Sequence, residues 1–178
     1  MLIRSPKYHA NCRASCADYS EWNFEEYFKA NSGGKLMLVN QEDCIFCKIA
    51  SKEIPSNIIY EDDKICCFLD IDPINEGHIL IIPKTHYLDI DELDEDTSIA
   101  IMKFSIVMTK VLKKVFSPDG YSIMQNGGIF NDVGHYHMHI FPRYKGDGFG
   151  WSFKDKLDFK NSNVIRDKLI CILHQYVK

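Results

Sequence analysis

Alternating apolar and polar positions become dense and regular from residue 44 onward. Five short apolar runs, bounded by polar or glycine-rich turns, have the length and composition of β-strands. They are residues 58–61, 65–69, 79–83, 121–125 and 136–141. The first two runs flank the polar turn Asp62-Asp63-Lys64 and predict a hairpin, and the last two flank a glycine-rich loop.

Two longer segments have helical periodicity instead. In residues 94–116 apolar side chains recur at helical spacing, Asp94 is a plausible N-cap, and Ser117-Pro118-Asp119-Gly120 ends the helix. The apolar positions are Ile99, Met102, Ile106, Val107, Val111 and Val115. A last helix begins near Asn161 or Asn163. Strands that mostly follow one another, with one long helix, predict an α+β fold with an antiparallel sheet.

Length and local composition divide the chain into three parts. Its 178 residues are enough for one domain with a substantial core. Residues 1–40 differ in character and predict an N-terminal extension with a short helix around residues 22–28. Residues 41–151 form the predicted domain, and residues 152–178 form a C-terminal helical segment.

Charge and hydropathy narrow the classes of partner. The net charge of −4 provides no basic excess, which argues against a nucleic acid as the main partner. The apolar runs are too short to cross a bilayer. Residues 1–14 contain no apolar segment of the signal-peptide kind. We therefore expect a cytoplasmic protein that binds neither nucleic acid nor membrane.

The most unusual pattern is a row of histidines. His135, His137 and His139 alternate with Tyr136 and Met138. Residues two apart in a strand share a face, so the three imidazoles should lie on one face about 7 Å apart. Three interpretations are open: chance polar alternation, a His-x-His metal site, or a nucleophilic histidine with two helpers.

The third interpretation has a chemical basis. A neutral imidazole attacks phosphorus well, and its unperturbed pKa lies near neutrality. Neighbouring imidazoles resist being protonated together, which favours a neutral, nucleophilic His137. A protonated neighbour, His139, can stabilise the charge that grows on phosphate oxygens. The reaction then proceeds through a phosphohistidine species.

The row and several other segments together resemble the histidine triad (HIT) family of nucleotide-binding proteins. The segments appear in family order along the chain. They are Cys44-Ile-Phe-Cys47, Glu53-Ile-Pro-Ser, Phe68-Leu-Asp70-Ile-Asp72-Pro73, Gly77-His78-Ile-Leu-Ile-Ile-Pro83-Lys84-Thr-His86, Gln125-Asn126-Gly127-Gly128 and His135-Tyr-His137-Met-His139. The resemblance implies a HIT-like fold with a five-stranded antiparallel sheet, one long helix and a C-terminal helix. It also implies a homodimer.

The resemblance further implies roles for individual residues. His137 would attack the α-phosphate of a purine nucleotide derivative and form a nucleotidyl-histidine, with His139 contacting the phosphate. Asn126 would lie near the phosphate and leaving group, and Asp70 would accept hydrogen bonds from the ribose. Ile45 or Phe46, together with Ile71, would line the base pocket. The alternative for Asp70 and Asn126 is an ordinary turn role.

A structural zinc site is a separate prediction. Cys44-x-x-Cys47 has suitable ligand spacing but supplies only half a site. The resemblance adds His86 and His135, and a closed Cys2His2 set leaves no open position for substrate. A redox motif or inert thiols are the alternatives for the cysteine pair. His78 either supports the triad by a hydrogen bond or is a satisfied core histidine.

One position departs from the family pattern and bears on the substrate. Asp132 stands where many members carry Ser or Thr, whose hydroxyl helps the leaving group. A carboxylate would favour an amine leaving group and repel a polyphosphate. The cysteine pair and His86 resemble the Hint branch, which hydrolyses nucleoside phosphoramidates and acyl-nucleotides. The alternatives are a dinucleoside polyphosphate hydrolase of the Fhit kind and a non-enzymatic nucleotide-binding or regulatory module.

Overall fold

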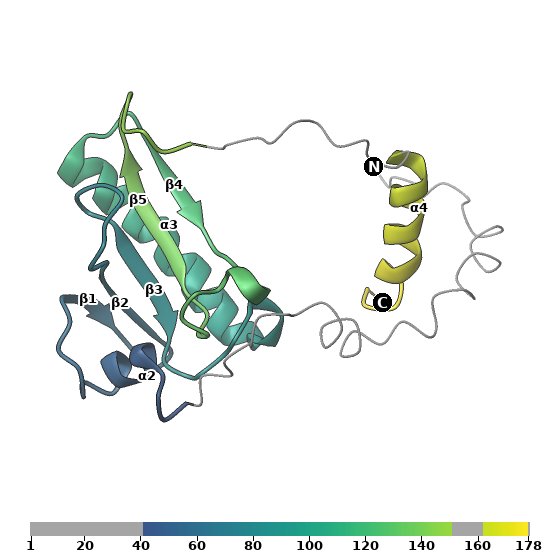
Figure 1. Cartoon of the computed structure of the whole chain (residues 1–178), viewed down its shortest axis with the longest axis horizontal. Coiled ribbons are helices and arrows are strands. Elements are labelled where there is room, and N and C mark those ends of the chain that lie inside the picture. The colour runs from purple at the N-terminus through teal and green to yellow at the C-terminus, as the bar shows by residue number, and fades with distance from the viewer. Residues whose placement is uncertain (1–40, 151–161, 178) are drawn as a thin grey trace, which may run out of the picture. The chain divides into compact units, whose positions relative to one another are not determined.

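A five-stranded antiparallel sheet is the framework of the protein in a computed structural model that describes residues 41–150 and 162–177 (Figure 1). The strands are β1 (Ile58–Glu61), β2 (Ile65–Leu69), β3 (Ile79–Pro83), β4 (Gly120–Met124) and β5 (Met138–Arg143), in the spatial order β1-β2-β3-β5-β4. The expected α+β fold with an antiparallel five-stranded sheet is confirmed. The helix expected around residues 22–28 lies outside the described residues.

Three α-helices and two short 3-10 turns complete the described chain. They are α2 (Ile45–Ala50), α3 (Glu95–Phe116), α4 (Ser162–Leu173), η2 (Ile90–Glu92) and η3 (Gly128–Phe130). Sequence periodicity predicted α3 and α4 but missed α2, which is too short to show a helical pattern. No helix in the described ranges is long and apolar enough to cross a membrane.

The strands alternate their side chains between two apolar clusters, one on each face of the sheet. The long helix α3 covers one face (Figure 1) and packs on odd-numbered residues of β2 and β3 such as Cys67 and Ile81. The short helix α2 packs on the even-numbered residues, with Phe46 and Ile49 against Phe68, Leu80 and Ile82. A one-residue slip would exchange the two sets, so burial on both faces fixes the register.

The ends of α3 are set by local chemistry. The Asp94 carboxylate accepts a hydrogen bond from the Thr97 amide at 2.9 Å, which caps the first turn. Ser117 ends the helix in the left-handed conformation (φ 46°). The buried face consists of Thr97, Ile101, Ser105, Met108, Thr109 and Leu112.

The apolar stripe that predicted α3 is therefore not its core face. Ile99, Met102, Ile106, Val107, Val111 and Val115 are all between 41% and 65% exposed. The face toward the sheet combines three large apolar side chains in the core cluster with three hydroxyl side chains, Thr97, Ser105 and Thr109. We call the six exposed residues the outer stripe of α3.

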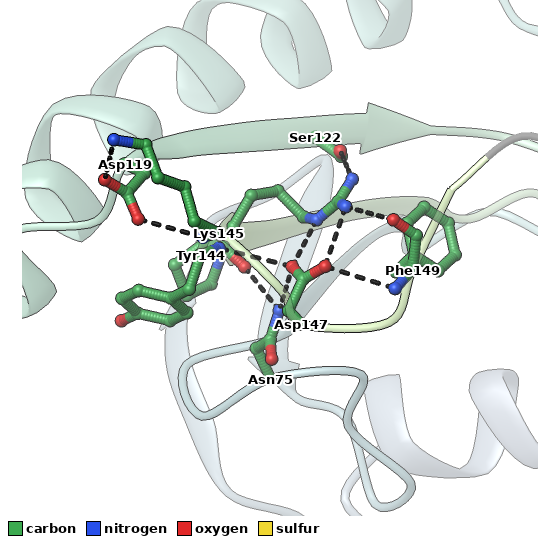
Figure 2. A network of polar contacts seen from close by, with 9 residues as sticks. Asn75, Asp119, Ser122, Tyr144, Lys145, Asp147 and Phe149 are labelled. Carbon is green, nitrogen blue, oxygen red and sulfur yellow. Dashed lines mark hydrogen bonds and ion pairs between the residues drawn. The ribbon is translucent and has the colours of Figure 1, made fainter.

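An ion pair anchors the chain where it leaves β5. Figure 2 shows Asp147 at the centre of this network, where its carboxylate accepts hydrogen bonds from the Arg143 guanidinium, from Asn75 and from the amides of Tyr144 and Phe149. The Arg143 interaction is the leading cause that holds the pKa of Asp147 well below its usual range. Asn75 also donates to the Pro142 carbonyl at 2.9 Å, so the network joins the β2–β3 connection to the end of β5.

We expect Asp147→Ala to lower the midpoint of thermal unfolding by on the order of 5 °C, because it leaves Arg143 without its carboxylate and frees two loop amides. Lys145→Ala is the control, since Lys145 pairs with Asp119 in solvent at 90% side-chain exposure and should change the midpoint by less than about 2 °C. Equal shifts in the two variants, measured by calorimetry, would show that the network does not anchor this segment.

Candidate functional site

The three histidines of the triad lie on the sheet face covered by α2. Only His139 belongs to β5, which begins at Met138. The predicted strand boundary at Tyr136 is wrong, because the Tyr136 amide donates to the carbonyl of Tyr87, outside the ladder, at 2.6 Å. The alternation persists nevertheless: Tyr136 packs in the cluster under α3, and the histidines point the other way. The ring centroids of His137 and His139 are 4.8 Å apart, closer than the spacing expected for a regular strand.

The protonation of His137 is set by a backbone carbonyl. Its Nδ1 lies 2.8 Å from the carbonyl oxygen of His135, which only accepts hydrogen bonds. Nδ1 therefore carries the proton of the neutral ring, and Nε2 carries the lone pair. The ring is 2% exposed and lies edge to face with Phe46 at 5.3 Å between centroids. In the neutral ring, the nitrogen without a proton is therefore Nε2.

A carboxylate stands at the free nitrogen of His137. The Oδ1 atom of Asp132 lies 3.7 Å from Nε2, and the Asp132 side chain is 84% exposed. This carboxylate is in contact with solvent and adjacent to the reactive nitrogen. It occupies the loop position where the sequence departs from the family pattern.

His139 has a different set of neighbours. Its Nδ1 lies 3.0 Å from Nε2 of His78, which is itself 2% exposed. Burial is the leading cause that lowers the pKa of His139 to about 4, and the neighbouring His137 and His78 contribute in the same direction. His139 is therefore neutral near pH 7, and the expectation of a protonated His139 is wrong because burial disfavours the charged ring.

Asp70 uses one carboxylate oxygen in a turn and directs the other toward this histidine pair. Oδ1 accepts a hydrogen bond from the Asp72 amide at 3.0 Å, which is the turn role considered above. Oδ2 lies 3.4 Å from Nδ1 of His78 and 3.7 Å from Nδ1 of His139. The acidic side chain is thus beside the triad, whichever role it has there.

The four predicted zinc ligands converge at the opposite end of the triad. The Cys44 sulfur is 3.3 Å from Nδ1 of His135, and the Cys47 sulfur is 3.3 Å from Nδ1 of His86. The two histidine Nδ1 atoms are 3.2 Å apart. All four ligand atoms lie within 4.8 Å of one another, so these residues could hold a metal ion.

Local structure explains why these atoms meet. Cys44 is the N-cap of α2 and Cys47 lies in its first turn, so both thiols project from the same end of the helix. Nε2 of His135 lies 3.0 Å from the Pro83 carbonyl at the end of β3, which places the proton on Nε2 and leaves Nδ1 free toward the thiols. Burial and the adjacent Cys44 raise the pKa of the Cys47 thiol to about 12. Binding of a metal would release protons from these thiols.

The loop that carries Asn126 is held by a residue that sequence analysis missed. The Asp89 carboxylate accepts hydrogen bonds from the Gly128 amide and the Ile90 amide, both at 2.7 Å. A Cβ atom at Gly127 would lie 2.5 Å from an Asp89 oxygen, so the loop approaches the carboxylate too closely for any side chain there. Asn126 itself is exposed between these contacts. Asp89 carries no motif, and no sequence signal identified it.

Asn131 holds the segment that leads into the triad, again through side-chain hydrogen bonds to the backbone. Its amide nitrogen donates to the Leu88 carbonyl at 2.8 Å, and its Oδ1 accepts from the Gly134 amide at 3.1 Å. The loop between Asn126 and His135 is therefore fixed at both ends, and Asp132 lies between these anchors.

The residues predicted to line a base pocket are not all brought together. Phe46 is buried against His137 and Phe68. Ile45 is 48% exposed, and Ile71 is fully exposed. Within the described residues, the aromatic ring of Phe46 is the base-pocket candidate that contacts the triad.

The family model described as the HIT domain matches residues 51–146, which is more than half of the chain. The chain belongs to the HIT domain family. Among curated relatives of this HIT protein, an uncharacterized HIT-like protein of Methanocaldococcus jannaschii is 47% identical over 59% of this chain and 82% of the relative. An adenosine 5'-monophosphoramidase of Candida albicans is 36% identical over 74% of this chain and 92% of the relative.

Solved structures agree with the family assignment. A crystal structure of a HIT family member from Bacillus subtilis aligns with a TM-score of 0.68 and 35% identity, covering 76% of this chain and 99% of that one. A zinc-bound histidine triad family protein from Mycobacterium smegmatis aligns with a TM-score of 0.57 and 31% identity, covering 77% of this chain and 99% of that one. The α+β fold described above therefore matches that of solved HIT family structures.

Proposed function

We propose that this HIT protein is a hydrolase of nucleoside 5'-monophosphate derivatives, phosphoramidates or acyl-nucleotides, and that it acts through a nucleotidyl-His137 intermediate. The hydrogen bond from Nδ1 of His137 to the His135 carbonyl carries the proposal, because it leaves Nε2 unprotonated beside a solvent-exposed carboxylate. The similarity to the Candida albicans phosphoramidase supports the substrate class.

In the first step Nε2 of His137 forms a bond to the α-phosphorus, and the bond from phosphorus to the leaving nitrogen or oxygen breaks. The leaving group takes up a proton, which Asp132 relays from solvent. The Nδ1 proton of His137 stays on the ring, and the His135 carbonyl stabilises the resulting positive charge. In the second step water attacks phosphorus, the bond to Nε2 breaks, and the proton of the water passes to solvent through Asp132.

The other residues of the site bind and orient the nucleotide. His139 contacts a phosphate oxygen, and Asn126 projects from the loop beside the leaving group. Asp70 accepts hydrogen bonds from the ribose with the oxygen that the turn leaves free. Phe46 forms the inner wall of a purine pocket, whose outer edge includes Ile45 and Ile71.

We also propose that the outer stripe of α3 is covered by a second copy of the chain. Six apolar side chains between 41% and 65% exposed on one helix face are an unusually apolar surface for a monomer. The neighbouring edge strand β4 exposes Tyr121 and Ile123, which would extend such an interface.

We expect that mixing the protein with adenosine 5'-phosphoramidate and quenching rapidly will show an acid-labile AMP adduct by intact mass. His137→Ala should abolish the adduct and reduce turnover by about three orders of magnitude or more, because it removes the attacking nitrogen. His174→Ala, at an exposed position of the C-terminal segment, is the control. Turnover that survives in His137→Ala would refute this nucleophile, and a protein that binds AMP without turnover would be a binding module.

Dinucleoside polyphosphate hydrolysis is the second candidate, because the same triad geometry serves it. The Asp132 carboxylate opposes it by repelling an anionic leaving group at the reactive nitrogen. We expect Asp132→Ser to raise the ratio of kcat/KM for diadenosine triphosphate over the phosphoramidate by about tenfold. Asp132→Asn separates the loss of charge from the gain of a hydroxyl. An unchanged ratio in both variants would show that Asp132 does not select the leaving group.

We further propose that Cys44, Cys47, His86 and His135 bind a structural zinc ion. The donor set is a closed Cys2His2 site, and a zinc-bound relative supports the choice of metal. Cys44→Ala should lose about one zinc ion per chain by elemental analysis and should unfold at a lower temperature. The control is Cys66→Ala, which removes a buried thiol from the apolar cluster under α2 but not from the metal ligands, and this variant should keep the metal. Full zinc content in Cys44→Ala would exclude the four-ligand site.

A further inference from the structure

The buried histidine His78 has no part in the steps above. It immediately precedes β3 and is 2% exposed, on the same sheet face as the triad. Its ring lies 4.8 Å from the ring of Phe141 and 5.1 Å from that of His139, measured between centroids. A polar ring in such a position requires partners for both nitrogens, and these partners restrict where its proton lies.

The first partner is a backbone amide. The Ile74 N–H donates to Nδ1 of His78 at 3.2 Å. An amide N–H cannot accept a hydrogen bond, so Nδ1 must carry a lone pair. Burial lowers the pKa of His78 despite the opposing effect of Asp70, so the ring is neutral and its single proton lies on Nε2.

The second partner is His139. Nε2 of His78 is 3.0 Å from Nδ1 of His139, and because Nε2 carries the proton, His78 donates and His139 accepts. Nδ1 of His139 is then unprotonated, and the proton of its neutral ring lies on Nε2. His137 has the opposite tautomer, since its Nδ1 is protonated by the contact with the His135 carbonyl.

We propose that His78 is a positioning residue that fixes His139 as a hydrogen-bond donor through Nε2, next to the lone pair on Nε2 of His137. The proposal rests on the proposed function, in which His139 contacts a phosphate oxygen. A donor at that place stabilises the charge that develops on the phosphate during attack, whereas a lone pair would repel it. Backbone geometry thereby gives two adjacent histidines opposite roles in one step.

Asp70 defines the competing arrangement. If Nδ1 of His78 were protonated toward Oδ2 of Asp70 at 3.4 Å, Nε2 of His78 would accept from His139, and His139 would present a lone pair to the phosphate. The Ile74 amide opposes this, because its N–H would then face another N–H. A metal ion bound by Asp70, His78 and His139, whose ligand atoms lie within 4.8 Å, would equally exclude the proposed hydrogen bond.

The wild-type protein tests the proposal without any substitution. Long-range ¹H–¹⁵N correlation spectra of histidine-labelled protein at pH 7 distinguish Nδ1–H from Nε2–H tautomers. We expect Nε2–H for His78 and His139 and Nδ1–H for His137. A Nδ1–H tautomer at His139, or more than one zinc ion per chain bound at these residues, would overturn the proposal. This readout needs no turnover, so it remains decisive even if the proposed hydrolase activity fails.

Two variants connect the tautomer to the reaction. His78→Leu removes the donor and should slow formation of the AMP adduct by about tenfold or more, with little change in KM. His78→Gln places an amide nitrogen near the position of Nε2 and should restore most of the rate and the Nε2–H signal of His139. Zinc content and thermal unfolding of both variants report whether the fold is retained. Wild-type adduct kinetics in a folded His78→Leu would contradict the proposal.

Discussion

The interaction on which the rest of the site depends is the hydrogen bond between the ring of His137 and the backbone carbonyl of His135. Three chemically identical side chains occur in five residues, and nothing in their own chemistry distinguishes them. Backbone groups do so. The Pro83 carbonyl accepts a hydrogen bond from Nε2 of His135, so the Nδ1 lone pair of His135 faces the thiols. The His135 carbonyl accepts a hydrogen bond from Nδ1 of His137, so the Nε2 lone pair of His137 stays free. Because Pro83 ends β3 and His135 lies just before β5, the path of the backbone sets the tautomer of each ring.

Antiparallel pairing of β3 with β5 brings the triad histidines next to their partners at the two ends of β3. In this pairing Ile79 lies opposite Ile140 and Ile81 opposite Met138. The start of β3 therefore lies beside the later part of β5, where His78 meets His139, and the end of β3 lies beside the residues that precede β5. His86 follows that end of β3 and meets His135 there. A five-residue strand thus separates the candidate metal site from the His78–His139 pair, with His137 between them.

Sequence patterns predicted what local chemistry determines. The bounds of β1, β2 and β3 agree with the apolar runs, and Asp94 caps α3 as expected. The predicted start of β5 was wrong. Apolar and polar residues still alternate at Tyr136, but its amide donates to the Tyr87 carbonyl rather than to a neighbouring strand. The same limitation applies to α3, where periodicity located the helix but could not identify which stripe faces the sheet. Asp89 and Asn131 were missed, since the contacts that tie the loop to the segment at residues 88–89 join residues 39 and 43 positions apart, which no local pattern predicts.

The metal cluster and the proposed nucleophile are coupled through one residue. His135 offers its Nδ1 atom to the cluster and its carbonyl to the His137 ring, so the same peptide unit belongs to both sites. A metal ion that holds the His135 side chain also restricts rotation of its backbone, and with it the direction of the carbonyl. The proposed zinc ion would therefore act on the proposed reaction without contacting the substrate, through the His135 carbonyl that sets the tautomer of His137.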